Sequence, residues 1–435
     1  MMAWIALLIF GLGYLVVVTE ELTGLRKSTP MVLAASLIWL LVGLEHRGLA
    51  GGHEITELAH HAMLEFGELF LFLLAAMTFV NTLEERGLFR AIQAAMVSRG
   101  LRYRTLYWLC GWMAFVLSPI FDNLTTALLV GSILATVGRG RPEFQARTGL
   151  SVVVAANAGG AFSPFGDITT LMVWQDGKVD FFGFLGLFVP SLVNWLIPAV
   201  WLARRLPDDH APASPDRTRL KPGALVIGAM FLVTIGISVT FQMLLKIPPV
   251  FGMLCGLSVL ELYGQYLNRK NGKANIVDEP DEYYAASACS EGAPDVFEQL
   301  QKAEWDTLLF FGGVILAIAG LQGFGWLSWA AEFTYQGLGP TVSNIGVGLV
   351  SAIFDNIPVM AAALSMNPSM DQVQWLLIAL TAGVGGSLLS LGSAAGVALM
   401  GQLPGIYTFS YHLRFLPILL AGYFASIGVH LWLNG

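Results

Sequence analysis

Residues 118–130 read SPIFDNLTTALLV, and residues 351–363 read SAIFDNIPVMAAA. Both stretches contain Ile-Phe-Asp-Asn, which places an aspartate, Asp122 or Asp355, among apolar residues. A carboxylate at the centre of a bilayer costs about 2.5–3.5 kcal/mol on insertion scales, so an acidic residue inside a membrane segment indicates a functional site. The repetition of the motif indicates that the chain has two related halves.

The composition predicts an all-α polytopic membrane protein. The chain has 435 residues, of which 55% are hydrophobic and 12% are charged, about half the charged fraction of a soluble domain. The net charge of −7 comes with no basic cluster of the kind that binds nucleic acid. The three cysteines show neither a disulfide framework nor a zinc spacing. We therefore expect membrane lipid as a partner and no nucleic acid.

Apolar runs long enough to cross a bilayer recur along the whole chain. Lys and Arg gather in alternate loops, which predicts that those loops are cytoplasmic and that both termini are periplasmic. Residues 2–19 lack a basic leader and a small-residue cleavage site, so they are expected to be a first span and not a removed signal. The predicted full spans are 3–19, 30–44, 63–83, 149–175, 181–203, 223–245, 248–267, 305–325, 372–400 and 415–433.

Two further apolar segments, 105–138 and 341–369, are predicted to be re-entrant helical hairpins. Basic residues flank the first segment at both ends, so both ends should face the cytoplasm. Its first arm, 106–117, would be a helix about 18 Å long, which is too short for a hydrocarbon core of about 30 Å. The Ile-Phe-Asp-Asn motifs form the tips, which must be buried in protein because irregular backbone is not tolerated in lipid.

The two halves of the sequence are predicted to contain the same elements in the same order. The N-terminal repeat, 1–206, holds the hairpin 105–138 and a broken helix, 149–175. A linker, 207–222, leads to the C-terminal repeat, 223–435, with a hydrophilic loop, 269–304, the hairpin 341–369 and a broken helix, 372–400. Each half has five full crossings, and an odd number inverts the second half relative to the first. Two glycine pairs, 159–160 and 385–386, mark corresponding breaks.

The hairpin tips and the broken helices carry side chains with oxygen atoms, and small hard cations prefer oxygen ligands. Asp167 in the first half aligns with Ser393 in the second, so the first half should hold more negative charge. We therefore expect Na⁺ at Asp122, Asn123, Asn157 and Asp167. The full predicted set for cation or proton binding is Asp122, Asn123, Thr126, Asn157, Asp167, Thr169, Thr170, Ser351, Asp355, Asn356, Ser390 and Ser393.

Several of these residues have structural alternatives. Asp is a good helix N-cap, and that role is more expected for Asp355, which is followed by Asn-Ile-Pro, than for Asp122. Ser and Thr in spans often bond their own backbone. Glu65 and Glu68, one helical turn apart in the third span, are either a proton path or pH sensor or interfacial residues. The nearby His53, His60 and His61 fit a solvated helix better than a metal site.

The stretches SPIFDNLTTALL, NAGGAFSPFGDITTLMVWQ and SAIFDNIPVMAAAL resemble the NhaD-type sodium/proton antiporters of the ion transporter superfamily. This resemblance implies a homodimeric exchanger of the bacterial inner membrane that moves Na⁺ or Li⁺ against H⁺ and uses no cofactor. It also implies that the functional polar positions are Asp122, Asn123, Asn157, Asp167, Thr169, Thr170, Ser351, Asn356, Ser390 and Ser393.

Other functions remain open at this point. Arsenite and carboxylate carriers share the architecture, and fold does not determine function. Carboxylate carriers place Ser-Asn-Thr at both tips, however, and Asp122 and Asp167 would repel an anion. An intramembrane aspartyl protease would need a glycine where Pro164 stands, so no enzymatic activity is expected. If Na⁺ and H⁺ compete for the same carboxylates, exchange needs no second pathway. No Lys or His lies at either tip, and His412 and His430 lie outside the broken segments.

Overall fold

The computed structural model describes residues 1–47, 52–210, 220–274 and 295–435. The central parts of the predicted linker and of the hydrophilic loop, 211–219 and 275–294, lie outside the described residues. The regular secondary structure of the described residues is helical, apart from one isolated bridge between Arg102 and His210. The prediction of an all-α protein is therefore confirmed.

Within the described residues, seven segments are long and apolar enough to cross a membrane, so the protein is polytopic. The other three predicted spans are not among these seven segments. The first is α1 (Met2–Val18), and each of the two broken spans forms two helices, α8 (Pro142–Gly160) with α9 (Ile168–Gln175) and α19 (Gln372–Gly385) with α20 (Ala394–Gln402). The seven segments are Ser28–Glu45, His53–Glu85, Phe181–Ala203, Ala224–Leu245, Val250–Arg269, Trp305–Gly323 and Leu416–Asn434.

The chain forms two compact units. One comprises Met1–Phe66, Gly100–Ala213 and Asp306–Gly435, and the other comprises Gly67–Arg99 and Ser214–Trp305. Each unit contains segments from both halves of the sequence, so the two units do not correspond to the two predicted repeats. The division into repeats 1–206 and 223–435 stays a prediction. All the predicted tip and break residues lie in the first unit.

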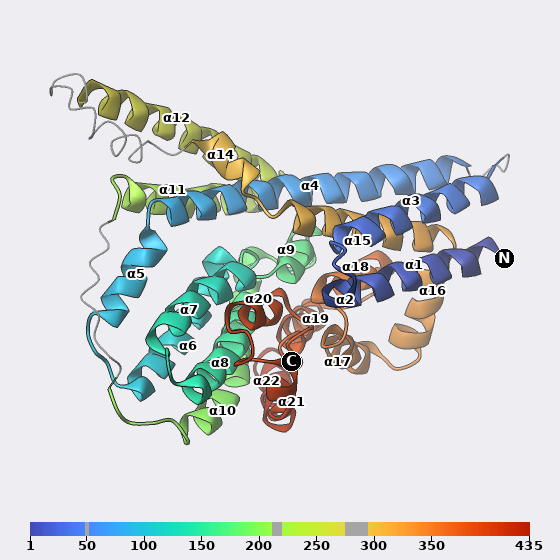
Figure 1. The fold of residues 1–435 in the computed structure, drawn as a ribbon. Coiled ribbons are helices and arrows are strands. Elements are labelled where there is room, and N and C mark those ends of the chain that lie inside the picture. Colours follow the sequence, from blue (N-terminus) through green and yellow to red (C-terminus); the bar gives the residue numbers. More distant parts are fainter. Residues whose placement is uncertain (48–51, 211–219, 275–294) are drawn as a thin grey trace. The chain divides into compact units, whose positions relative to one another are not determined.

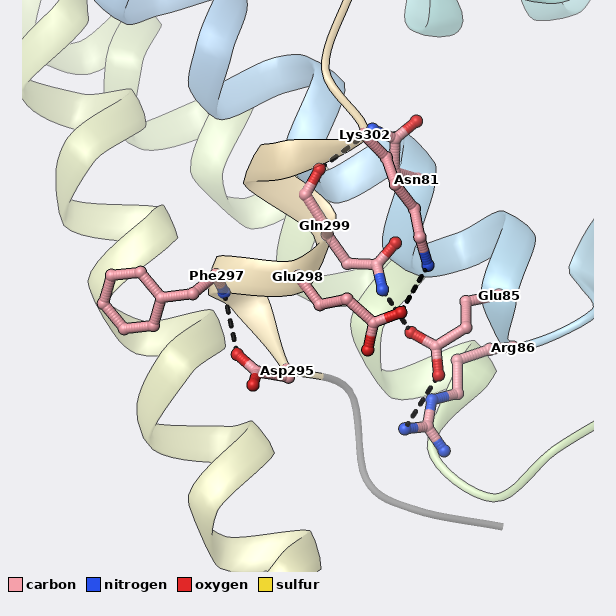
Figure 2. A network of polar contacts seen from close by, with 8 residues as sticks. All are labelled: Asn81, Glu85, Arg86, Asp295, Phe297, Glu298, Gln299 and Lys302. Carbon is pink, nitrogen blue, oxygen red and sulfur yellow. Dashed lines mark hydrogen bonds and ion pairs between the residues drawn. The ribbon is translucent and has the colours of Figure 1, made fainter. Parts of the chain in front are cut away.

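In the second unit, α11 (Ala224–Thr240) packs against α12 (Val250–Ala274). The unit also holds α5 (Leu88–Val97), α14 (Val296–Gln301) and the end of α4 (Gly52–Glu85). A polar network joins α14 to the end of α4 (Figure 2). The Gln299 amide donates to Glu85 Oε2 at 2.7 Å, and Asn81 donates to the Gln299 carbonyl at 3.2 Å. Glu85 also lies 3.7 Å from Arg86, whose buried charge it offsets.

In the first unit, two pairs of helices surround the quoted motifs. α6 (Tyr103–Phe121) and α7 (Asn123–Val137) meet at Asp122, and both contact α8 (Figure 1). α17 (Pro340–Ser351) and α18 (Asn356–Met366) meet at residues 352–355, and both contact α19. This unit also contains α2 (Glu20–Thr23), α3 (Ser28–Glu45), α10 (Phe188–Ala203), α15 (Trp305–Gly323), α16 (Trp326–Ala331), α21 (Phe409–Leu413) and α22 (Leu416–Asn434).

The first arm of the first hairpin is longer than the prediction. The first arm of segment 105–138 was expected to be a helix of 12 residues, but α6 has 19. The helix continues through Pro119 and ends only at Phe121. At about 1.5 Å per residue it is roughly 28 Å long. The short-arm argument for a re-entrant hairpin is therefore wrong for α6, although α7, α17 and α18 have 15, 12 and 11 residues.

The two motif regions repeat the same local contacts. Ser118 donates to the Ala156 carbonyl at 2.6 Å, and Ser351 donates to the Ala382 carbonyl at 2.9 Å. Close backbone approaches also correspond, because a Cβ on Gly160 would lie 2.6 Å from the Gly166 carbonyl oxygen, and the same distance separates a Cβ on Gly386 from that of Gly392. Only glycine fits there, which explains the glycine pairs at both breaks.

Candidate functional site

Asp167 lies at the centre of a buried polar cluster. It is the residue just before α9, where the first broken span resumes, and its side chain is 4% exposed. The backbone N–H and the hydroxyl of Thr169 donate to Asp167 Oδ1 at 3.0 and 3.1 Å. The helix N-terminus therefore holds one oxygen of this carboxylate, as expected for an anionic N-cap.

Both tips donate an amide to the same carboxylate. Asn356 Nδ2 lies 3.1 and 3.0 Å from Asp167 Oδ1 and Oδ2. Asn123 Nδ2 lies 3.3 Å from Oδ2. No lysine, arginine or histidine among the described residues lies within ion-pair distance of Asp167. The charge is thus solvated by neutral donors, which leaves it available to a cation.

Asn157 connects this cluster to the second broken span. Its side-chain oxygen accepts a hydrogen bond from Asn123 at 3.3 Å, and its Nδ2 donates to Ser393 Oγ at 3.1 Å. Ser393 is the N-cap of α20 and corresponds to Asp167 in the alignment of the halves. The structure therefore brings together six of the predicted residues: Asn123, Asn157, Asp167, Thr169, Asn356 and Ser393.

Asp122 caps α7. Its carboxylate accepts hydrogen bonds from the Thr125 backbone N–H at 2.8 Å and from the Thr125 hydroxyl at 2.9 Å. Its backbone adopts φ 63° and ψ 163°, a region that only glycine occupies without strain. Such strain gathers at functional sites, and here it places the cap and the donor amide of Asn123 on consecutive residues.

Asp355, for which capping was one of two alternatives, occupies the N-cap position of α18. Its side chain makes no capping hydrogen bond to α18. The position that corresponds to Thr125 is Pro358, and proline has no N–H to donate. The backbone N–H of Asp355 instead donates to the hydroxyl of Tyr14 at 2.9 Å.

Other predicted residues bind the backbone. The Thr170 hydroxyl donates to the carbonyls of Ser163 and Asp167, both at 2.7 Å. Ser351 donates to a carbonyl of α19, as described above. Ser390 is an exception, because its hydroxyl lies 3.4 Å from the side-chain sulfur of Met400. The Thr126 hydroxyl is fully buried and has no hydrogen-bond partner among the described atoms.

Glu65 and Glu68, both in α4, fall in different units. Glu65 belongs to the first unit. Its side chain is 47% exposed and lies 3.1 Å from His61. Glu68 belongs to the second unit. His53 pairs with Glu57 at 3.3 Å, and no group of three His, Cys, Asp or Glu side chains in the described chain could hold a metal.

Sequence reasoning missed His412. This residue is fully buried, and its Nε2 lies 3.0 Å from the carbonyl of Ser387 and 3.2 Å from that of Leu388, inside the break between α19 and α20. It lies 25 residues after Ser387 and 24 after Leu388, so no local pattern reveals the contact.

Known proteins resemble this chain over nearly its full length. The family model described as a citrate transporter matches residues 2–383. The Na⁺/H⁺ antiporter NhaD of Vibrio cholerae is 47% identical over 435 residues, which cover 99% of this chain and 91% of that protein. The chain belongs to the NhaD-type antiporters of the ion transporter superfamily. NhaD of Alkalimonas amylolytica is 47% identical over the whole of this chain, and Sodium/proton antiporter 1 of Arabidopsis thaliana is 31% identical over 98% of it.

Membership of the NhaD-type family identifies the chain as a transporter and not an enzyme. The Asp-Asn tips and the Gly-Asp break that carried the resemblance are the same elements that meet at Asp167.

Proposed function

We propose that this NhaD-type chain exchanges Na⁺ or Li⁺ for H⁺ across the bacterial inner membrane. The observation that carries the proposal is a single buried carboxylate, Asp167, which accepts hydrogen bonds from both tip asparagines. A dehydrated Na⁺ needs oxygen ligands and negative charge. Asp167 supplies the charge, and the oxygens of Asn157 and Ser393 lie in the same cluster.

Exchange follows from competition at this site. A proton bound to Asp167 neutralises the carboxylate and removes the charge that holds Na⁺. Na⁺ binding in turn favours the ionised form and releases the proton. Without a bound ion the site carries an uncompensated negative charge, and moving that charge across a dry barrier is unfavourable. A bound Na⁺ or H⁺ neutralises the charge. Asp122, one residue before Asn123, adds negative charge at the same tip.

We further propose that the fold is an inverted repeat with two re-entrant hairpins. Both termini then lie in the periplasm, and the protein assembles as a homodimer. The corresponding contacts at Gly160 and Gly386 support a structural repeat. The odd number of predicted crossings in each half supports its inversion. Irregular tips at membrane depth require burial in protein, and Asn356 in the second tip is only 4% exposed.

A second candidate is carboxylate transport, which the family model described as a citrate transporter favours. The two are separated with everted membrane vesicles from bacteria that lack their own antiporters. Na⁺/H⁺ exchange predicts that Na⁺ addition to respiring vesicles dissipates the pH gradient and that citrate has no effect. Uptake of labelled citrate with no response to Na⁺ or Li⁺ would instead establish the carboxylate carrier.

A further inference from the structure

His412 is a buried histidine whose two ring nitrogens both have partners. Nε2 faces the Ser387 and Leu388 carbonyls at 3.0 and 3.2 Å, and Nδ1 lies 2.6 Å from the hydroxyl of Tyr407. Carbonyl oxygens only accept hydrogen bonds, so Nε2 must carry the proton. In the neutral ring Nδ1 then accepts from the Tyr407 hydroxyl. The surroundings therefore select one tautomer.

The ring supplies a donor where the helix is interrupted. α19 ends at Gly385 and α20 begins at Ala394. In a continuous helix the Gly392 N–H would bond to the Leu388 carbonyl, but here it donates to Leu389 at 3.2 Å. Ser387 and Leu388 are both 2% exposed, so their carbonyls need a donor from within the protein. His412 provides it.

The segment that His412 holds leads to the cation cluster. Its far end is Ser393, whose hydroxyl accepts a hydrogen bond from Asn157. Asn157 accepts in turn from Asn123, which also donates to Asp167. A displacement of the 386–393 backbone would move Ser393 and release the Asn157 amide. The position of a proposed Na⁺ ligand thus depends on a residue that does not touch the site.

We propose that His412 is a positioning residue for the cation site. As a neutral Nε2–H donor, it fixes the break of the second broken helix, and Tyr407 fixes its tautomer. The inference rests on the proposed Na⁺/H⁺ exchange and deepens it, because it assigns cation affinity to a side chain beyond the ligands. Outer partners of this kind typically change metal affinity by about 10- to 100-fold when removed.

The test compares His412→Leu, which removes the donor, with His412→Gln, whose amide can donate to the carbonyls and accept from Tyr407. In everted vesicles, His412→Leu should raise the half-saturating Na⁺ concentration about 10-fold or more, and His412→Gln should restore most of the affinity. Tyr407→Phe should shift the same quantity in the same direction by less. Na⁺-dependent thermal stabilisation of purified protein measures the same affinity without turnover.

His430→Leu is the matched control. His430 is equally buried and its Nε2 lies 3.0 Å from the Val373 carbonyl, close to the start of α19 and away from the break. It should lower thermal stability and leave the half-saturating Na⁺ concentration unchanged. If His412→Leu does not accumulate in the membrane, Tyr407→Phe and His412→Gln carry the test.

Two results would overturn the inference while the proposed function stands. One is wild-type exchange with an unchanged half-saturating Na⁺ concentration in His412→Leu and Tyr407→Phe. The other is a His412→Gln variant as impaired as His412→Leu, which would assign the effect to the shape of the ring. A wild-type protein with no Na⁺-dependent exchange would refute the proposed function itself.

Discussion

Asn356 places its side-chain amide 3.1 and 3.0 Å from the two carboxylate oxygens of Asp167, a residue 189 positions earlier in the chain. The second tip thus contributes a neutral donor to a charge that belongs to the first half. Its own aspartate, Asp355, makes no bond in this cluster. The two halves therefore have unequal roles, and a single buried carboxylate accepts hydrogen bonds from both tips.

Replacement of Asp167 should abolish exchange. Asp167→Asn keeps the size of the side chain and removes the charge that a cation needs, so Na⁺-dependent proton movement in everted vesicles should disappear. Asp355→Asn should leave part of the activity or shift the cation affinity, because the side chains bonded to the Asp167 carboxylate are those of Asn123, Thr169 and Asn356. Complete loss in both variants, at equal protein levels in the membrane, would show that the two halves contribute alike.

Asp122 should have two separable roles. Asp122→Asn retains a capping side chain of the same size, so the protein should accumulate normally but fail to exchange. Asp122→Ala should also lose about 1 kcal/mol of stability with the cap, measured as a lower unfolding temperature in detergent. Thr125→Ser, which keeps both donors, is the control. Wild-type exchange by Asp122→Asn would show that Asp122 acts only as a helix cap and is not needed for transport.

The apparent affinity for Na⁺ should weaken as the pH falls. If one proton and Na⁺ compete for the same carboxylate, the half-saturating Na⁺ concentration rises about tenfold per pH unit below the pH of half-protonation. The affinity falls at low pH because the protonated carboxyl group has no negative charge to attract Na⁺. The measurement is the Na⁺ dependence of exchange at several pH values.

A constant half-saturating concentration, with only the maximal rate changing, would mean that the proton is carried elsewhere. Glu65→Gln and Glu68→Gln would then be the variants to compare, since these are the acidic residues predicted for a separate proton path.

The break in the first broken span should not tolerate a side chain at Gly160. Gly160→Ala would place a Cβ 2.6 Å from the Gly166 carbonyl oxygen, a backbone atom that cannot move aside, so folding or membrane accumulation should fail. Gly346→Ala, in α17 with no atom within 4 Å of its added Cβ, is the control. It should be neutral or stabilise the helix by up to about 1 kcal/mol. Equal stability of both variants would contradict the close approach of the backbone at Gly160 to the backbone at Gly166.

Residue 143 should face the cytoplasm. In a background without native cysteines, Glu143→Cys should resist an impermeant maleimide added to intact cells and react in everted vesicles. Asp180→Cys, in the loop predicted to be periplasmic, should show the opposite pattern. Both positions are exposed in the structure. Labelling of Glu143→Cys from outside would contradict the inverted arrangement of the hairpins.

The sequence alone determined the local elements. Apolar run lengths predicted the spans, the glycine pairs predicted the breaks at 160 and 386, and the repeated Ile-Phe-Asp-Asn predicted the two tips. These features depend on neighbouring residues, since glycine and a buried carboxylate restrict the backbone wherever they occur. The helix α6 exceeded its predicted length because Pro119 did not end it.

Tertiary structure alone decided which side chains meet. It brought Asn356 to Asp167 and His412 to the break at Ser387. These partners are far apart in the chain, and their distances result from the packing of several helices. Many weak contacts fix that packing together, so no short stretch of sequence contains it.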